Sequence, residues 1–252
     1  MASKTGGTGS AGADAGGAGR GLKVRVKTAR GRTVSQTRWL QRQLNDPYVA
    51  AARRDGYRSR AAYKLAEMDD KFHLLRPGAL ILDLGATPGG WTQVAVARTN
   101  ADPAAKGKRG RVVAVDINPM DSVPGSDFLL LDFLDPEAPE LVRALLGGAP
   151  DVVLSDMAAP ATGHRPTDHL KIVALCEIAL DFAVAVLAPG GAFVAKVLQG
   201  GTEGTLLTLL KKNFAQVRHA KPKASRADSA EMYVVATGFR PATEPETEDT
   251  AP

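Results

Sequence analysis

The chain has 252 residues, 44% of them hydrophobic, and its 32 lysines and arginines exceed its 27 acidic residues, which gives a formal net charge of +5. This length and apolar content predict one sizeable domain with its own core, and the basic balance favours a polyanionic partner. The single cysteine, Cys176, excludes an internal disulfide and a multi-cysteine zinc site. Because no apolar run is long enough to span a membrane and the N-terminus lacks a signal-peptide core, we expect a cytoplasmic protein.

The two ends of the chain have compositions that disfavour folding. Residues 1–35 are rich in small and then in basic side chains, and we predict that they form a disordered basic arm. Such an arm is either a contact for RNA or a solubilising tail. Residues 241–252 are predicted to be a disordered acidic tail, which leaves residues 36–240 as the folded domain.

Two helices are predicted before the first strand, over residues 37–46 and 60–72. Ser59 is the expected N-cap of the second helix, because a serine oxygen can accept from the free N–H groups of a first turn. Arginines gather just before this helix, at Arg53, Arg54, Arg58 and Arg60. Arginines beside an aromatic side chain are typical of a nucleic-acid surface, although an exposed, solvated helix has a similar composition.

A buried strand over residues 79–84 leads into a glycine-rich turn and a helix over residues 91–97. Glycine at 85, 89 and 90 allows positive φ and a close approach of the backbone to a ligand. The spacing G-x-x-x-G-G differs from the dinucleotide fingerprint G-x-G-x-x-G. A wider loop that follows an acid, Asp83, suits a nucleoside that carries an amino acid, such as S-adenosylmethionine, while a plain connecting turn is the alternative.

Strands and helices alternate through the rest of the chain, which predicts a mostly parallel sheet with helices on both faces. The clearest helix, over residues 170–187, should carry Leu175, Ile178, Phe182 and Ala185 on one apolar face. Four acids fall at or near strand ends and are expected to converge on one edge of the sheet, where such folds bind ligands: Asp83, Asp116, Asp132 and Asp156. The further predicted strands are residues 111–116, 128–132, 151–156, 192–197, 214–219 and 231–237, and the further helices are 136–146 and 202–213.

Several motifs resemble the FtsJ/RrmJ family, also called RlmE. They occur in order between about residues 57 and 240, as RSRAAYKL at 58–65, DLGATPGGW at 83–91, SDMA at 155–158, LAPGG at 187–191, KVLQG at 196–200, SRA at 225–227 and EMYVVATG at 231–238. The family consists of S-adenosylmethionine-dependent methyltransferases that act on the ribose 2′-oxygen of ribosomal RNA. The chain departs from it at Ala159-Pro160, where Pro-Asn is usual, and at Leu131, where glycine is common.

The resemblance implies a Rossmann-like methyltransferase fold with a seven-stranded sheet and a catalytic set of Lys64, Asp156, Lys196 and Glu231. It also implies a uridine of the peptidyl-transferase A loop in large-subunit rRNA as the target, so the expected activity is that of an rRNA (uridine-2′-O-)-methyltransferase. Together with the turn, it gives the expected cofactor-binding residues as Asp83, Gly85, Gly89, Gly90, Trp91, Asp116, Asp132 and Asp156.

A 2′-hydroxyl is a poor nucleophile until it loses its proton, and a lysine takes that proton only when it is itself neutral. We therefore hypothesise that Lys196 is the general base and that Asp156 orients it and the methyl donor. Lys64 and Glu231 would position the hydroxyl. Alone, Lys196 would be interpreted as a strand lysine that extends its amine to solvent, and Glu231 as an edge charge.

The expected partner is large-subunit rRNA or the assembled large ribosomal subunit, bound by a monomer without a membrane or a metal. The four histidines lack zinc-ligand spacing. A tRNA ribose methyltransferase and a non-catalytic ribosome assembly factor remain alternatives, and the glycine spacing disfavours a nicotinamide dehydrogenase. RNA contacts are expected from the four arginines above and from Lys211, Lys212, Arg218, Lys221, Lys223 and Arg226.

Overall fold

The computed structural model describes residues 25–26, 30–160, 162–200 and 204–241, in two compact units, Met1–Asp46 and Pro47–Pro252. Most of the predicted arm and nearly all of the predicted tail lie outside the described residues, so those boundaries remain predictions.

In the first unit, α1 (Val34–Leu44) begins before the predicted start at residue 37. A capping box explains this start, because Thr33 Oγ1 accepts from the Gln36 N–H at 3.2 Å and Gln36 Oε1 accepts from the Thr33 N–H at 3.0 Å.

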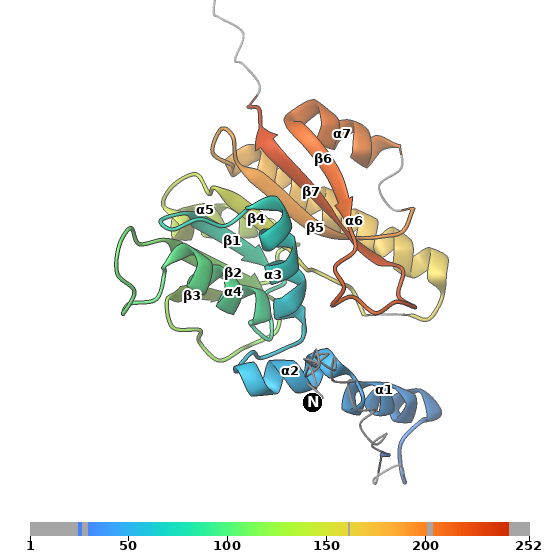
Figure 1. The fold of residues 1–252 in the computed structure, drawn as a ribbon. Helices are drawn as coiled ribbons and strands as arrows, with labels where there is room; N and C mark the ends of the chain where they lie inside the picture. The colour runs from blue at the N-terminus through green and yellow to red at the C-terminus, as the bar shows by residue number, and fades with distance from the viewer. Residues whose placement is uncertain (1–24, 27–29, 161, 201–203, 242–252) are drawn as a thin grey trace, which may run out of the picture. The chain divides into compact units, whose positions relative to one another are not determined.

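Seven strands of the second unit form one sheet in the order β3-β2-β1-β4-β5-β7-β6 (Figure 1). β7 runs antiparallel to both of its neighbours, and the remaining pairs are parallel. The predicted Rossmann-like, mostly parallel sheet is confirmed. The strands are β1 (Leu80–Leu84), β2 (Arg111–Asp116), β3 (Ser126–Leu130), β4 (Val152–Ser155), β5 (Ala192–Leu198), β6 (Phe214–Ala220) and β7 (Glu231–Phe239).

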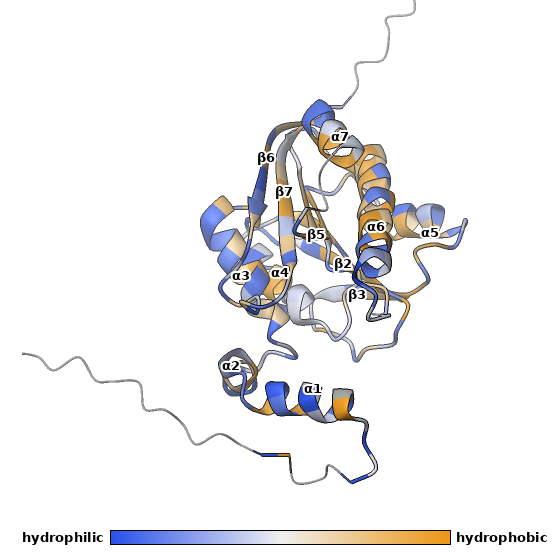
Figure 2. Ribbon diagram, turned by 90° about the vertical axis from the view of Figure 1, so that its right-hand side faces the viewer, coloured by the Kyte–Doolittle hydropathy of each residue, from blue (hydrophilic) through white to orange (hydrophobic). Residues whose placement is uncertain are grey.

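Helices cover both faces of the sheet. Figure 2 shows α3 and α4 on one side and α5, α6 and α7 on the other. Alternation along the strands supplies both cores: Leu82 packs in the cluster with α5, α6 and α7, whereas Ile81 packs in the cluster with α3 and α4. The helices of this unit are α2 (Pro47–Asp55), α3 (Ala61–Phe72), α4 (Gly90–Thr99), α5 (Ala138–Leu146), α6 (Arg165–Val186) and α7 (Thr205–Asn213).

Only part of the apolar face predicted for α6 is buried. Phe182 is buried and Leu175 is half-buried. Ile178 is 39% exposed and Ala185 is exposed, whereas Cys176, Ala179 and Ala183 are buried. The helix is apolar on several sides, so its sequence contains more than one stripe of helical spacing, and the sheet decides which stripe is buried. α6 also begins five residues before the predicted start, with a proline in its first turn, where the missing N–H costs no helical hydrogen bond.

The start of α3 differs slightly from the prediction. The helix begins at Ala61, and the N-cap position is Arg60, whose side chain makes no capping hydrogen bond. Ser59 nevertheless contributes as expected of a cap, because its Oγ accepts from the Ala61 N–H at 3.3 Å.

The turn between β1 and α4 depends on its glycines for two different reasons. Gly85 and Gly89 have φ of 76° and 106°, in the region that side chains disfavour, and a Cβ on Gly85 would lie 2.7 Å from the backbone nitrogen of Met157. At Gly90 a Cβ would lie 2.5 Å from Ser59 Oγ. The first two glycines therefore shape the turn, and the third allows α4 to pack against the start of α3.

Candidate active site

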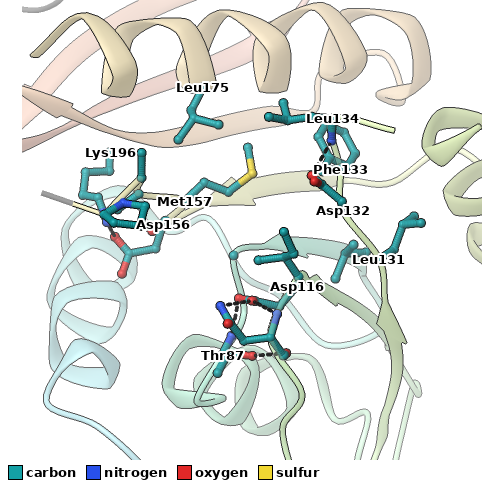
Figure 3. A pocket seen from close by; sticks show the side chains of 17 residues that line it. Thr87, Asp116, Leu131, Asp132, Phe133, Leu134, Asp156, Met157, Leu175 and Lys196 are labelled. Atoms are coloured by element: carbon teal, nitrogen blue, oxygen red, sulfur yellow. Dashed lines mark hydrogen bonds and ion pairs between the residues drawn. The ribbon is translucent and has the colours of Figure 1, made fainter. Parts of the chain in front are cut away.

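A cavity of about 480 Å³ lies at the carboxyl ends of the central parallel strands (Figure 3). Its walls come from the turn after β1 and from the segments that follow β2, β3 and β4. Five of the predicted site residues line it: Gly85, Asp116, Asp132, Asp156 and Lys196. Other residues of the lining, none of them predicted as a site residue, include Thr87, Asn118, Phe133, Met157 and Leu175.

Asp116 ends β2 and is held on both carboxylate oxygens. Oδ2 accepts from the Thr87 N–H at 2.9 Å, and Oδ1 accepts from the Asn118 N–H at 2.7 Å (Figure 3). The Thr87 hydroxyl in turn donates to the Asn118 carbonyl at 2.9 Å. These bonds tie the glycine turn to the segment after β2 and fix a carboxylate on the cavity wall, where its remaining lone pairs can accept from hydroxyl groups.

Asp132 also lines the cavity, but it lies beyond the strand that was predicted to contain it. β3 ends at Leu130, two residues before the predicted end. Asp132 Oδ1 accepts from the Leu134 N–H at 2.9 Å, and the Asp132 carbonyl accepts from the Asp135 N–H at 3.0 Å. The side chain thus forms an Asx-type turn, which competes with strand pairing and ends β3.

The other predicted cofactor-binding residues, Asp83, Gly89, Gly90 and Trp91, lie outside this lining, so their contact with a cofactor remains a prediction. Asp83 is fully buried in β1, where its Oδ2 accepts from Thr92 Oγ1 at 2.7 Å. Burial raises the pKa of Asp83 to about 7, although the Thr92 hydroxyl opposes the shift. Trp91 is buried against α3, with its Nε1 donating to the Ala61 carbonyl at 2.9 Å.

The four predicted catalytic side chains form two ion pairs. Lys196 Nζ lies 2.9 Å from Asp156 Oδ1 and donates to the Asp156 carbonyl at 2.7 Å (Figure 3). Lys64 Nζ lies 2.7 Å from Glu231 Oε1. α3 supplies Lys64, β5 supplies Lys196, β7 begins with Glu231, and Asp156 directly follows β4.

Tyr233 joins the two ion pairs. Its hydroxyl accepts from Lys64 Nζ at 3.2 Å and donates to Asp156 Oδ1 at 2.9 Å. Burial, followed by the nearby Asp156 and Glu231 carboxylates, raises the pKa of Tyr233 well above its ordinary value. The phenol therefore keeps its proton and serves as a donor. The four predicted side chains belong to one connected network.

Asp156 carries the negative charge at the centre of this network. Burial alone would raise its pKa, but the attraction of Lys196 and Lys64, with hydrogen bonds from Lys196 and Tyr233, leaves the pKa below its ordinary value. Asp156 is therefore ionised at neutral pH. Its Oδ1 accepts from Lys196 Nζ and from the Tyr233 hydroxyl, and Lys64 attracts the same carboxylate through its charge.

Sequence reasoning missed Tyr233. A signal was present, because Tyr233 lies two residues after Glu231 on β7, and side chains two apart on a strand point to the same face. The tyrosine also contacts the Trp91 ring, with a centroid separation of 5.5 Å. Trp91 thus packs against Tyr233 and supports the network indirectly.

Several of the predicted RNA-contacting cations hold loops in place. Arg58 donates to the carbonyls of Asp121 at 2.6 Å and Ser122 at 2.7 Å, and Arg60 donates to the carbonyl of Ala224. The lysines and arginines with exposed side chains include Arg53, Lys211, Lys212, Arg218 and Lys223. Their contact with RNA remains a prediction.

The part of the chain that the structure describes also bears on metal binding and on membrane insertion. No group of three or more His, Cys, Asp or Glu side chains there is arranged to hold a metal ion. No helix among the same residues is long and apolar enough to cross a bilayer.

Residues 57–239 match the family model for FtsJ-like methyltransferases. The chain belongs to the FtsJ-like methyltransferase family. This span contains all four residues of the two ion pairs and every residue that lines the cavity, so the site lies wholly within the part shared with FtsJ-like proteins.

Curated relatives and a solved structure agree with this family. The chain is 63% identical over 240 residues to "Ribosomal RNA large subunit methyltransferase E" of Parvibaculum lavamentivorans, with 94% of each chain covered. It is 64% identical over 221 residues to the protein of the same name from Azorhizobium caulinodans, covering 88% of this chain and 90% of that one. A Plasmodium falciparum structure described as a ribosomal RNA methyltransferase is similar with a TM-score of 0.63 and 30% identity, over 73% of this chain and 98% of that chain.

Proposed function

We propose that the protein transfers a methyl group from S-adenosylmethionine to the 2′-oxygen of a ribose in large-subunit ribosomal RNA, at the uridine of the peptidyl-transferase A loop. The observation that carries the proposal is the Lys196–Asp156 pair, at 2.9 Å, on the wall of a cavity in a chain of the FtsJ-like family. The names of the curated relatives support ribosomal RNA of the large subunit as the substrate class.

The cavity fits the proposed cofactor in size and in chemistry. About 480 Å³ falls within the range of small-molecule sites. We assign Asp116 to the ribose, Asp132 to the adenine and Asp156 to the methionine end, and the presence of all three in the cavity lining supports this assignment. Bound there, the cofactor would supply an electrophilic methyl group whose leaving group is a neutral thioether.

The protein's own contribution is to position and deprotonate the ribose hydroxyl. Asp156 holds the Lys196 amine through its carboxylate and its carbonyl, which fixes the nitrogen at the cavity wall. In its neutral form, that amine accepts the proton of a 2′-hydroxyl beside it. General-base catalysis of this kind contributes about 10²- to 10⁴-fold to the rate.

Lys64 and Glu231 are proposed to hold the hydroxyl in line for attack. Neither side chain lines the cavity, but 11% of Lys64 and 19% of Glu231 is exposed, which leaves a surface for a substrate group to contact. Tyr233 connects them to Asp156, so the nucleophile and the base would be aligned by one hydrogen-bonded framework.

The test is to incubate the protein with labelled S-adenosylmethionine and, separately, with naked rRNA, large ribosomal subunits and tRNA, and then to map the labelled ribose. Label on the A-loop uridine of rRNA or subunits supports the proposal. Label on tRNA alone would identify a tRNA ribose methyltransferase. Binding to subunits without transfer would identify an assembly factor, and either result would overturn the proposal.

A further inference from the structure

The loop between β6 and β7, residues 221–230, is packed against α3. Ala224 is fully buried and Ser225 is 6% exposed, although neither belongs to a helix or a strand. Lys221 closes the loop on itself, because its Nζ donates to the Ser229 carbonyl at 2.8 Å. A surface loop with its centre buried in this way is held by specific contacts.

The contacts come from α3 and its N-cap. The Glu67 carboxylate accepts from the Lys223 N–H at 2.5 Å and from the Ala224 N–H at 3.2 Å. Arg60 donates to the Ala224 carbonyl. Glu67 lies one helical turn after Lys64, so the helix that carries one member of the catalytic network also anchors the loop.

Ser225 links the anchored loop to Glu231, a second residue of the catalytic network. Its Oγ donates to Glu231 Oε1 at 2.9 Å, and the same oxygen lies 2.7 Å from Lys64 Nζ. Two partners on one oxygen restrain both the position of that oxygen and the plane of the carboxylate. Without the Ser225 hydroxyl, the carboxylate would be held by Lys64 and by the hydroxyl of Tyr233, and its plane could tilt.

We propose that Ser225 is a positioning residue for Glu231, held in place by the attachment of residues 223–224 to Glu67. The inference rests on the proposed function, in which Glu231 orients the ribose hydroxyl. Ser225 is not among the residues that line the cavity, and its hydroxyl donates to Glu231, so it is proposed to act through the Glu231 carboxylate.

The first test is a double-mutant cycle in single-turnover methylation of large subunits. A hydrogen bond to a charged group contributes about 1.5 kcal/mol or more, so Ser225→Ala should slow methylation about tenfold with the dissociation constant for S-adenosylmethionine unchanged. In a Glu231→Ala background the same substitution should slow it less than about twofold. Ser126→Ala, which removes a hydroxyl that donates to the Val123 carbonyl outside the site, serves as the matched control.

A second pair of variants separates the hydroxyl from the shape of the side chain. Threonine and valine have nearly the same shape, so Ser225→Thr should methylate about tenfold faster than Ser225→Val at equal thermal stability. Equal rates for these two variants, or an equal loss from Ser225→Ala in both backgrounds, would overturn the inference. If the wild type labels no ribose, the proposed function fails instead, which keeps the two failures distinguishable.

Discussion

Replacing Asp83 by asparagine should change how the stability of the protein depends on pH. Asp83 is fully buried, and its pKa is raised from 3.8 to about 7 in the folded state. The folded protein therefore binds this proton more tightly than the unfolded chain does. As pH rises from about 4 to about 7, the free energy of unfolding of the wild type falls by up to about 4 kcal/mol from this group alone.

Asparagine does not titrate, and its side-chain oxygen can still accept from Thr92 Oγ1. The free energy of unfolding of Asp83→Asn minus that of the wild type should therefore increase with pH and level off above about pH 8. All other groups titrate in both proteins, so the difference isolates Asp83.

Urea unfolding followed by circular dichroism, at half-unit steps between about pH 4 and pH 8, measures this difference. Thr92→Val provides a second check. Without the Thr92 hydroxyl, which lowers the pKa of Asp83, the free energy of unfolding should continue to fall to a higher pH than in the wild type. Parallel stability curves for Asp83→Asn and the wild type would show that Asp83 is ionised in the folded protein at neutral pH, and would refute the reasoning.

Three further predictions concern the cavity, the surface and the core. Arg58→Ala should weaken binding of S-adenosylmethionine several-fold by calorimetry, since it releases the carbonyls of residues 121–122 beside the glycine turn; an unchanged dissociation constant would contradict this. Replacing Lys211, Lys212 and Lys223 by alanine should weaken RNA binding and flatten its dependence on salt, by about one unit of slope per lost phosphate contact; an unchanged slope would mean that these lysines touch no phosphate. Cys176 should resist thiol reagents in the native protein at pH 8, because burial raises its pKa to about 12, and rapid labelling would show that α6 opens.

The sheet was predictable from the sequence because its central strands are buried on both faces. β2 has the predicted bounds, since its apolar run is enclosed by Arg111 and Asp116. The predictions were wrong where a side-chain hydrogen bond sets the end of a strand or helix, or where a tertiary contact selects the buried face of a helix. The Asp132 turn ends β3 two residues before its predicted end, the Thr33 capping box starts α1 three residues before its predicted start, and the packing of α6 buries one of several apolar stripes.

The sequence predicted which residues form the candidate site better than it predicted the contacts between them. The spacing of four acids near strand ends placed Asp116, Asp132 and Asp156 at one cavity, because parallel strands present their carboxyl ends together. The sequence could not distinguish a glycine that faces a ligand from one that faces a helix, since both positions exclude a Cβ. Nor could it show that Arg58 and Arg60 bind backbone carbonyls, because those partners lie far away in the sequence.

The central claim is that the Lys196 amine takes the proton of the ribose hydroxyl, and Lys196→Arg tests it most directly. Arginine keeps a positive charge beside Asp156 but does not lose its proton in proteins. The measurement is the single-turnover rate of ribose methylation on large subunits, with cofactor binding and thermal unfolding checked for the same protein. We predict a rate lower by about 10²- to 10⁴-fold with cofactor binding retained. A rate within about threefold of the wild type would contradict the account.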